Sequence, residues 1–171
     1  MSKPIIYVLV GGGSGGHLAP LIPIAQKIKK LDPSSVVIHI GQSGDKLNEM
    51  LKNEPSIDKF YTVTAGKFRR YNGESFLRKL FDIKTNLLNI RDFFRFLIGI
   101  AQSYFLLRRI HPSIIFTKGG YVCAPVGIAG RFRGVPYITH DSDATISLAH
   151  RIISKKAVMH LTAMPVEYYK Q

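Results

Sequence analysis

Residues 7–17 read Tyr-Val-Leu-Val-Gly-Gly-Gly-Ser-Gly-Gly-His, an apolar run that leads directly into a glycine-rich turn. Four apolar residues in succession predict a buried parallel strand, and the glycines let the backbone turn sharply and approach a ligand with no Cβ in the way. A helix is expected next, with its first turns at residues 18–25 and Pro20 near its first position, where a missing N–H group costs little. Unpaired N–H groups and the positive end of a helix dipole then point to the same place. The stretch therefore predicts a phosphate-binding turn.

The glycine turn can be compared with three kinds of phosphate-binding or catalytic site. Gly11, Gly13 and Gly16 match the pattern G-x-G-x-x-G. The version that binds nicotinamide cofactors also needs an acidic residue about 20 positions later, whereas Asp32 stands before the second predicted strand rather than after it. A nucleotide-binding P-loop does not fit either, because His17 occupies the place of its lysine. The third interpretation uses His17 itself. A helix N-terminus disfavours the imidazolium and keeps a neutral base available, which suits proton removal from an alcohol.

The rest of the chain alternates strand patterns with helix patterns. Strands are expected at residues 35–40, 59–64, 113–117, 135–139 and 157–161, and helices at 45–53, 93–107, 125–131 and 144–153. This alternation predicts an α/β fold, a Rossmann-like parallel sheet with helices on both faces. Ligands of such sheets bind at the carboxyl ends of the strands, where the winding reverses. A second glycine turn at Gly119 and Gly120, and the pair His140 and Asp141, follow later strands, so we expect them at the same crevice.

Composition limits the class of protein. A length of 171 residues with 46% hydrophobic residues suits one folded domain. The single cysteine, Cys123, excludes a disulfide framework, and residues 1–4 lead into a strand rather than into the apolar core of a signal peptide, so a cytoplasmic chain is expected. The formal net charge of +13 predicts attraction to a polyanion. Charge alone leaves both nucleic acid and an anionic membrane surface open.

Residues 67–109 combine many cations with many aromatic rings. Their upstream part resembles segments that lie in a membrane interface, and the residues predicted to face the membrane are Phe68, Arg69, Arg70, Phe76, Arg78, Lys79 and Phe81. The apolar run at residues 93–107 is shorter than the ~20 residues that cross a bilayer, which predicts a packed helix. Its periodicity predicts that one side packs on the sheet, with Leu97, Ile100, Ala101, Tyr104 and Phe105. A solvated basic face over an ordinary core is the alternative for this stretch.

Three motifs stand in order at the ends of predicted strands. They are G-G-G-S-G-G-H-L-A-P at residues 11–20, G-G-Y-V-C-A-P at 119–125 and H-D-S-D-A at 140–144. Together they resemble the MurG family of glycosyltransferases over essentially the whole chain. The resemblance implies the acceptor-side half of a two-domain GT-B fold, with residues 1–163 as a family-28-like N-terminal domain and 164–171 as a linker or tail toward a C-terminal domain.

The same resemblance implies an activity and its residues. An inverting transferase would move N-acetylglucosamine from UDP-N-acetylglucosamine to a lipid-diphosphate-linked muramyl peptide in peptidoglycan synthesis. His17 would accept or relay the proton of the acceptor hydroxyl. The residues implied in substrate binding are Ser14, Gly15 and Gly16 as donors to a diphosphate, Gly119, Gly120 and Tyr121 at the acceptor diphosphate, and His140, Asp141 and Asp143. The protein would act as a peripheral protein on the cytoplasmic face of the membrane, and its partners would be the lipid-linked acceptor, the anionic bilayer and a donor-binding domain or chain.

Alternatives remain for several of these features. The chain could be a fragment, one subunit of a split enzyme, or a non-catalytic module that binds a membrane, an acceptor or nucleic acid. Asp141 and Asp143 could be N-cap residues of the helix at 144–153. Cys123, His39 and His150 are expected to be packing or surface residues, because no metal-ligand spacing surrounds them. The sequence therefore predicts no metal and no resident cofactor, and of the two polyanions we expect the membrane rather than nucleic acid.

Overall fold

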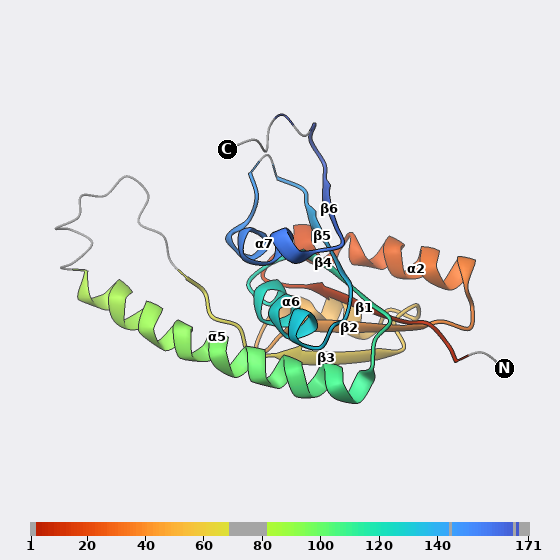
Figure 1. Ribbon diagram of the computed structural model, residues 1–171, viewed down its shortest axis with the longest axis horizontal. Coiled ribbons are helices and arrows are strands. Elements are labelled where there is room, and N and C mark those ends of the chain that lie inside the picture. The colour runs from red at the N-terminus through yellow and green to blue at the C-terminus, as the bar shows by residue number, and fades with distance from the viewer. Residues whose placement is uncertain (1–2, 69–81, 144, 166, 168–171) are drawn as a thin grey trace.

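A sheet of six parallel strands forms the centre of the computed structural model, which describes residues 3–68, 82–143, 145–165 and 167 (Figure 1). The strands lie in the order β3-β2-β1-β4-β5-β6, and every neighbouring pair is parallel. Their bounds are β1 Ile6–Gly11, β2 Val36–Gln42, β3 Lys59–Val63, β4 Ile114–Gly119, β5 Tyr137–Asp141 and β6 Met159–Thr162. The predicted Rossmann-like parallel sheet is confirmed, and the strand order reverses between β1 and β4.

Helices cover both faces of the sheet. Their bounds are α1 Gly15–Leu18, α2 Leu21–Leu31, the 3-10 turn η1 Lys46–Asn48, α3 Glu49–Lys52, α5 Ile83–Ile110, α6 Cys123–Phe132, α7 Leu148–Ile153 and the 3-10 turn η2 Ser154–Lys156. On one face Leu18 and Leu21 pack with Leu9 of β1. On the other face Val8 packs with Val126 of α6. Successive residues of β1 thus point to opposite faces of the sheet, as strand geometry requires.

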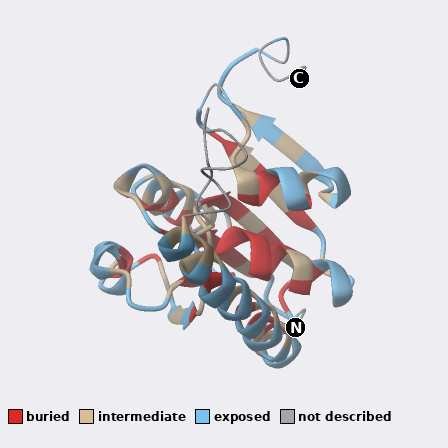
Figure 2. Cartoon of the chain, turned by 90° about the vertical axis from the view of Figure 1, so that its left-hand side faces the viewer, coloured by how far each residue is buried: buried red, intermediate tan, exposed pale blue. Residues whose placement is uncertain are grey.

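Burial is concentrated in the strands and in α6, as Figure 2 shows. The buried side of α6 includes Cys123, Val126 and Ala129, and the helix contacts α5 and α7 as well as strands β1, β4 and β5. Because α6 is apolar around most of its circumference, it can only be stable with this cover on both sides. Helix α5 packs along α6 on this face and also contacts β3, and its Leu107 lies in the same buried cluster as Val8 and Ile40 of the sheet.

The first helix differs from its prediction. Instead of one helix beginning after the glycines, α1 forms a single turn that includes His17, and α2 begins at Leu21 after Pro20. The amide of Ala19 still donates to the carbonyl of Gly15, at 2.8 Å. Pro20 has no N–H group to continue this pattern, which interrupts the helix there. Pro20 is consequently the residue before α2 and not its first helical residue.

The buried face of α5 also differs from its prediction. Leu97 is 44% exposed and Phe105 is 64% exposed, so the expectation that they pack on the sheet is wrong. The contact runs instead through a small residue, because a Cβ on Gly99 would collide with the carbonyl oxygen of Thr64. The side chain of Gln102 accepts a hydrogen bond from the Thr64 amide, at 2.7 Å. Because α5 approaches the backbone of Thr64 closely at Gly99, this side of the helix has no room for large apolar side chains, and Leu97 and Phe105 lie on the exposed side.

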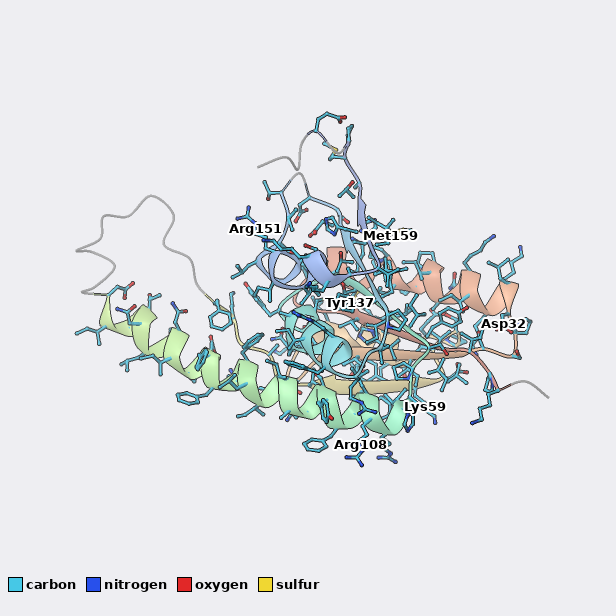
Figure 3. All side chains as sticks on the ribbon, in the orientation of Figure 1. Asp32, Lys59, Arg108, Tyr137, Arg151 and Met159 are labelled. Atoms are coloured by element: carbon cyan, nitrogen blue, oxygen red, sulfur yellow. The ribbon has the colours of Figure 1, made fainter. Side chains whose placement is uncertain are left out.

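The N-terminal half of α5 extends past the sheet in Figure 1. Asp82 caps this end, since its carboxylate accepts from the Thr85 amide at 3.0 Å. The opposite end stops at His111, whose left-handed backbone has a φ of 50°, and Arg108 points away from the sheet there (Figure 3). Among the described residues, no helix is both long enough and apolar enough to cross a membrane. Of the predicted membrane-facing residues, Phe68 is described, and Arg69, Arg70, Phe76, Arg78, Lys79 and Phe81 lie outside the described residues.

Candidate functional site

Two glycine turns meet where the strand order reverses. The turn after β1 contains Gly12, and the turn after β4 contains Gly119 and Gly120. Both residues of the second turn have a positive φ, 138° and 91°, which glycine adopts without strain. A Cβ on Gly120 would collide with the carbonyl oxygen of Gly12, so the two turns are in backbone contact. The predicted convergence of the glycine turns on one crevice is confirmed at this point of the sheet.

His17 lies between these turns. Its Nδ1 atom is 3.0 Å from the carbonyl oxygen of Gly12. Its ring covers Gly119, where an added Cβ would fall 2.7 Å from Nε2. His17 is the third residue of α1 and not the N-terminal residue of a long helix, so the carbonyl contact rather than a helix dipole orients the imidazole. The backbone of both turns therefore fixes the position of this side chain.

A cavity of about 270 Å³ opens beside His17. Its lining comes from five parts of the chain and comprises Gly12, Gly13, His17, Gly66, Phe68, Phe96, Gly120, Tyr121, Ala124, Asp143, Ser147, Leu148, Ala149 and Ile152. Of the site residues predicted from sequence, the cavity brings together His17, Gly120, Tyr121 and Asp143, and Phe68, which was predicted to face the membrane, lines it as well. Gly119 lies behind the His17 ring, and the predicted residues that do not line the cavity are Ser14, Gly15, Gly16, His140 and Asp141.

One wall of the cavity is aromatic. The rings of Phe68 and Phe96 meet edge to face with their centroids 5.7 Å apart. Lys67 places its Nζ atom 6.0 Å from the ring centroid of Tyr121, within the range of a cation–π contact. Phe96 belongs to α5, so this helix reaches the cavity with one ring. An apolar wall facing a polar one suits a ligand with a lipid or sugar part and an anionic part.

Asp45 was not expected at the site. Its Oδ2 atom accepts a hydrogen bond of 2.7 Å from the amide of Gly13, while its Oδ1 atom accepts from the amide of Leu47 at 3.0 Å. One amide of the glycine turn therefore donates to this carboxylate, which links the turn to the start of η1. The available signal was its position, because Asp45 follows the end of β2 at the same edge of the sheet as the glycine turn.

His140 and Asp141, the last residues of β5, point to opposite faces. The His140 ring lies 6.2 Å from that of Phe116, and burial, followed by the nearby Lys118 ammonium, lowers the pKa of His140. Asp141 is 4% exposed. Burial would raise its pKa, but the His150 imidazole and the Ser147 amide hold the pKa of Asp141 below its ordinary value.

The residues around Asp141 form a buried polar cluster. His150 is fully buried, with Nδ1 2.9 Å from Asp141 Oδ2 and Nε2 3.1 Å from the Thr117 hydroxyl. Lys118 is 3% exposed and donates to the Ser142 hydroxyl, and burial lowers its pKa. The N-cap of α7 is Ser147 rather than either predicted aspartate, since its hydroxyl accepts from the His150 amide at 3.2 Å. Within the described ranges, no three His, Cys, Asp or Glu side chains are placed to hold a metal ion.

Comparison with known proteins gives matches over most of the chain. Residues 7–161 match the glycosyltransferase family 28 N-terminal domain. The chain is 37% identical over 147 residues to a Clostridium kluyveri protein named UDP-N-acetylglucosamine–N-acetylmuramyl-(pentapeptide) pyrophosphoryl-undecaprenol N-acetylglucosamine transferase, which covers 86% of this chain and 37% of the relative. It is 34% identical over 170 residues to the Borreliella burgdorferi protein of the same name, covering 99% of this chain and 43% of the relative. The chain thus spans about two fifths of the length of these relatives.

Solved structures share the fold. The crystal structure of Acinetobacter baumannii MurG superposes with a TM-score of 0.73 at 20% identity, covering 95% of this chain and 42% of that one. A UDP-GlcNAc 2-epimerase from Methanocaldococcus jannaschii gives a TM-score of 0.61 at 11% identity, covering 96% of this chain and 40% of that one. At these identities the likeness concerns the fold, and it matches this six-stranded domain to one half of the GT-B fold of MurG.

Proposed function

This chain belongs to the glycosyltransferase family 28 N-terminal domain family and is MurG-like, and on that premise we propose that it is the acceptor-binding half of an inverting glycosyltransferase. The proposed reaction transfers N-acetylglucosamine from UDP-N-acetylglucosamine to a lipid-diphosphate-linked muramyl peptide in peptidoglycan synthesis. The names of the relatives support this choice of substrates. Because the chain spans only 37% and 43% of two such relatives, we assign most donor contacts to a C-terminal domain or a partner chain.

The observation that carries the proposal is the position of His17. A carbonyl oxygen can only accept a hydrogen bond, so the contact with Gly12 keeps the proton of the neutral imidazole on Nδ1. The lone pair is then on Nε2, on a ring that lines the cavity. A base in this position can take the proton of an acceptor hydroxyl as that oxygen attacks the anomeric carbon, and the diphosphate of the nucleotide leaves with the bonding electrons.

The glycine turns are proposed to bind diphosphate oxygens. Ser14, Gly15 and Gly16 begin α1, and the first amides of a helix have no intrahelical acceptor. Gly119, Gly120 and Tyr121 lie across the contact between the turns and would bound the acceptor diphosphate. Asp143 lines the same cavity and is proposed to contact the substrate, whereas His140 and Asp141 do not line it.

The exposed side of α5 supports peripheral docking on a membrane. Over residues 83–98 its exposed large apolar residues are Ile83, Leu87, Ile90, Phe93, Phe94, Leu97 and Ile98, and the exposed cations there are Lys84, Arg91 and Arg95. Apolar side chains at the bilayer interface and cations near anionic headgroups attract the same surface. Phe96 of the same helix lines the cavity, so docking would bring the cavity close to the headgroups. Residues 69–81, which include the other residues predicted to face the membrane, adjoin this helix in the sequence and lie outside the described residues.

The proposal is tested by reconstitution. The chain is mixed with a donor-binding half from one of the relatives, UDP-[¹⁴C]N-acetylglucosamine and a lipid-diphosphate-linked muramyl peptide in anionic vesicles. We expect radioactivity in the lipid fraction only when both halves are present. If the two halves form a complex that binds the acceptor without transfer, the chain is instead a non-catalytic acceptor-binding subunit.

A further inference from the structure

The connection between β5 and α7 is described at residues 142, 143 and 145–147, and its Asp143 and Ser147 line the wall of the cavity. We propose that Asp141 is a positioning residue whose buried carboxylate, close to His150, holds these described residues where Asp143 and Ser147 line the cavity. The importance of that position for the acceptor rests on the proposed function. The contacts that Asp141 makes with the connection, in contrast, can be tested in this chain without any substrate.

A closed ring of contacts joins the two ends of the connection. Asp141 Oδ1 accepts a hydrogen bond from the Ser147 amide at 3.2 Å. The Ser147 hydroxyl accepts one from the His150 amide at 3.2 Å. His150 Nδ1 returns to Asp141 Oδ2 at 2.9 Å. One oxygen of the carboxylate thus accepts a hydrogen bond from the connection, and the other lies within ion-pair distance of His150 in α7 without a hydrogen bond of good geometry.

Three contacts with the neighbouring strands β4 and β6 hold this ring of residues against the sheet. His150 Nε2 is 3.1 Å from the Thr117 hydroxyl of β4. The Lys118 ammonium, also from β4, donates to Ser142 at the start of the connection. His160 of β6 places Nε2 3.7 Å from Asp141 Oδ2. Since β4 and β6 are both neighbours of β5, the carboxylate cannot shift without disturbing three adjacent strands.

The chemistry of the ring favours positioning over simple packing. Asp141 is 4% exposed and His150 is 0% exposed, and burying such groups is unfavourable unless they are well paired. An apolar pair would fill the space without that cost. Only an acceptor at Asp141, however, can fix the direction of the Ser147 amide, and a charged acceptor fixes it more strongly than a neutral one.

Protonation of Asp141 should therefore release the connection. The titratable or charged groups that face this carboxylate are Lys118 from β4, Cys123 from α6, His150 from α7 and His160 from β6, with His140 and Asp143 beside it in the chain. The cationic partners favour the carboxylate, in agreement with a lowered pKa of Asp141. Release is thus expected only below the ordinary aspartate pKa of about 3.9.

The test is an NMR titration of the 171-residue chain, which requires no substrate. The amide shifts and exchange rates of Ser147 and His150 are followed from pH 7 to pH 2.5 together with the carboxyl carbon of Asp141. We expect both amides to titrate with the midpoint of Asp141 and to lose protection at least about tenfold as it protonates. Amides of β1, such as that of Val8, should remain protected through this transition.

Four variants complete the test. In Asp141→Asn the titration of Ser147 should disappear and its protection should be low at every pH, while Asp141→Glu, which keeps the charge, should restore a titration. His150→Gln should weaken Ser147 protection, and His111→Asn, an exposed histidine at the end of α5, should behave as the parent does. The proposal is overturned if Ser147 does not follow Asp141 in the parent, or if Asp141→Asn retains parental protection at Ser147. Neither result depends on glycosyl transfer. A failure of this proposal can therefore be distinguished from a failure of the proposed function, which the reconstitution assay detects.

Discussion

The Nδ1 atom of His17 lies 3.0 Å from the carbonyl oxygen of Gly12, within a single turn of the chain. This contact decides which ring nitrogen carries the proton of the neutral imidazole. The opposite side of the ring lies on Gly119, a residue of the other glycine turn. One backbone group thus sets the tautomer and another sets the position of the ring.

Replacing His17 should remove most of the transfer activity. In the reconstituted two-half assay, His17→Ala should lower kcat about 10²-fold or more, the usual effect of losing a positioned base. His17→Asn is the matched variant, since its amide can donate to the Gly12 carbonyl but cannot take a proton at neutral pH. It should be as inactive as His17→Ala while keeping the parental melting temperature. Turnover within threefold of the parent in either variant would rule out His17 as the base.

Gly119→Ala should destabilise the site more than backbone strain alone explains. The new Cβ would meet the His17 ring at 2.7 Å from Nε2, in a residue whose φ is 138°. Gly134→Ala is the control, because that residue also has a positive φ, 67°, but no atom within 4 Å of the added Cβ. We expect about 1 kcal/mol for the control from strain and about 1–3 kcal/mol more at Gly119, from the collision with His17 together with a φ that other residues rarely adopt. Urea denaturation measures both, and equal losses would mean that His17 does not rest on Gly119.

His39 should make the protein less stable as the pH falls below neutrality. It is fully buried in β2, and burial lowers its pKa from 6.5 to about 4. As the pH falls, His39 therefore becomes protonated near pH 6.5 in the unfolded chain but only near pH 4 in the folded chain. The stability that His39 contributes is fully present above pH 6.5 and is lost between pH 6.5 and pH 4. The shift corresponds to about 3 kcal/mol at pH 4.

The measurement is urea denaturation of the parent and of His39→Leu at intervals from pH 7 to pH 4. Because burial also lowers the pKa of His140 and His160, both proteins should lose stability in this range. The difference between them is the contribution of His39, and the variant should show the shallower slope. Parallel curves would show that His39 is not held neutral in the folded protein.

The exposed side of α5 should bind anionic vesicles. Phe93→Ser, Phe94→Ser and Leu97→Ser together change side chains that are 48%, 58% and 44% exposed and remove no charge. We expect cosedimentation of the parent to weaken with salt and to weaken further in this triple variant. Phe132→Ser is the control, as this ring is 71% exposed at the end of α6, away from the cavity. Equal binding by parent and triple variant, or stronger binding to nucleic acid than to vesicles at physiological salt, would contradict the membrane assignment.

The isolated chain should bind UDP-N-acetylglucosamine weakly. It corresponds to one half of the GT-B fold, and we assign most donor contacts to the other half. Calorimetry should detect no saturable binding below millimolar ligand. Tight binding would mean that this chain holds the donor site, and that the proposed division of the two substrates is wrong.

The strands and both glycine turns could be predicted from sequence because their signals are local. The apolar run before Gly11 and the positive φ of Gly119 and Gly120 depend on residues within a few positions. Alternation in a strand also bears on the site, since consecutive residues of a strand point to opposite faces of the sheet. His140 and Asp141 could not both have faced the crevice directly, and the structure places Asp141 inside the protein.

The parts that could not be predicted depend on contacts between distant segments. Periodicity placed Leu97 and Phe105 inside, but the close approach of Gly99 to Thr64 turned another side of α5 inward. The contact of Asp45 with Gly13 joins two loops that only the completed sheet brings together. Phe96 and Ser147 likewise enter the cavity from elements whose packing angles no local pattern specifies.

The central pairing of β1 with β4 also determines when the site can form during folding. These neighbours in the sheet are separated in sequence by two strands and the whole of α5, and the contact between His17 and Gly119 depends on their register. Contacts between residues so distant in sequence require closure of a long loop and form slowly compared with local helices and turns. A folding intermediate that has completed only β1, β2 and β3 would possess the first glycine turn without the surface on which the imidazole rests. The contact between His17 and Gly119 therefore cannot form before the two halves of the sheet join.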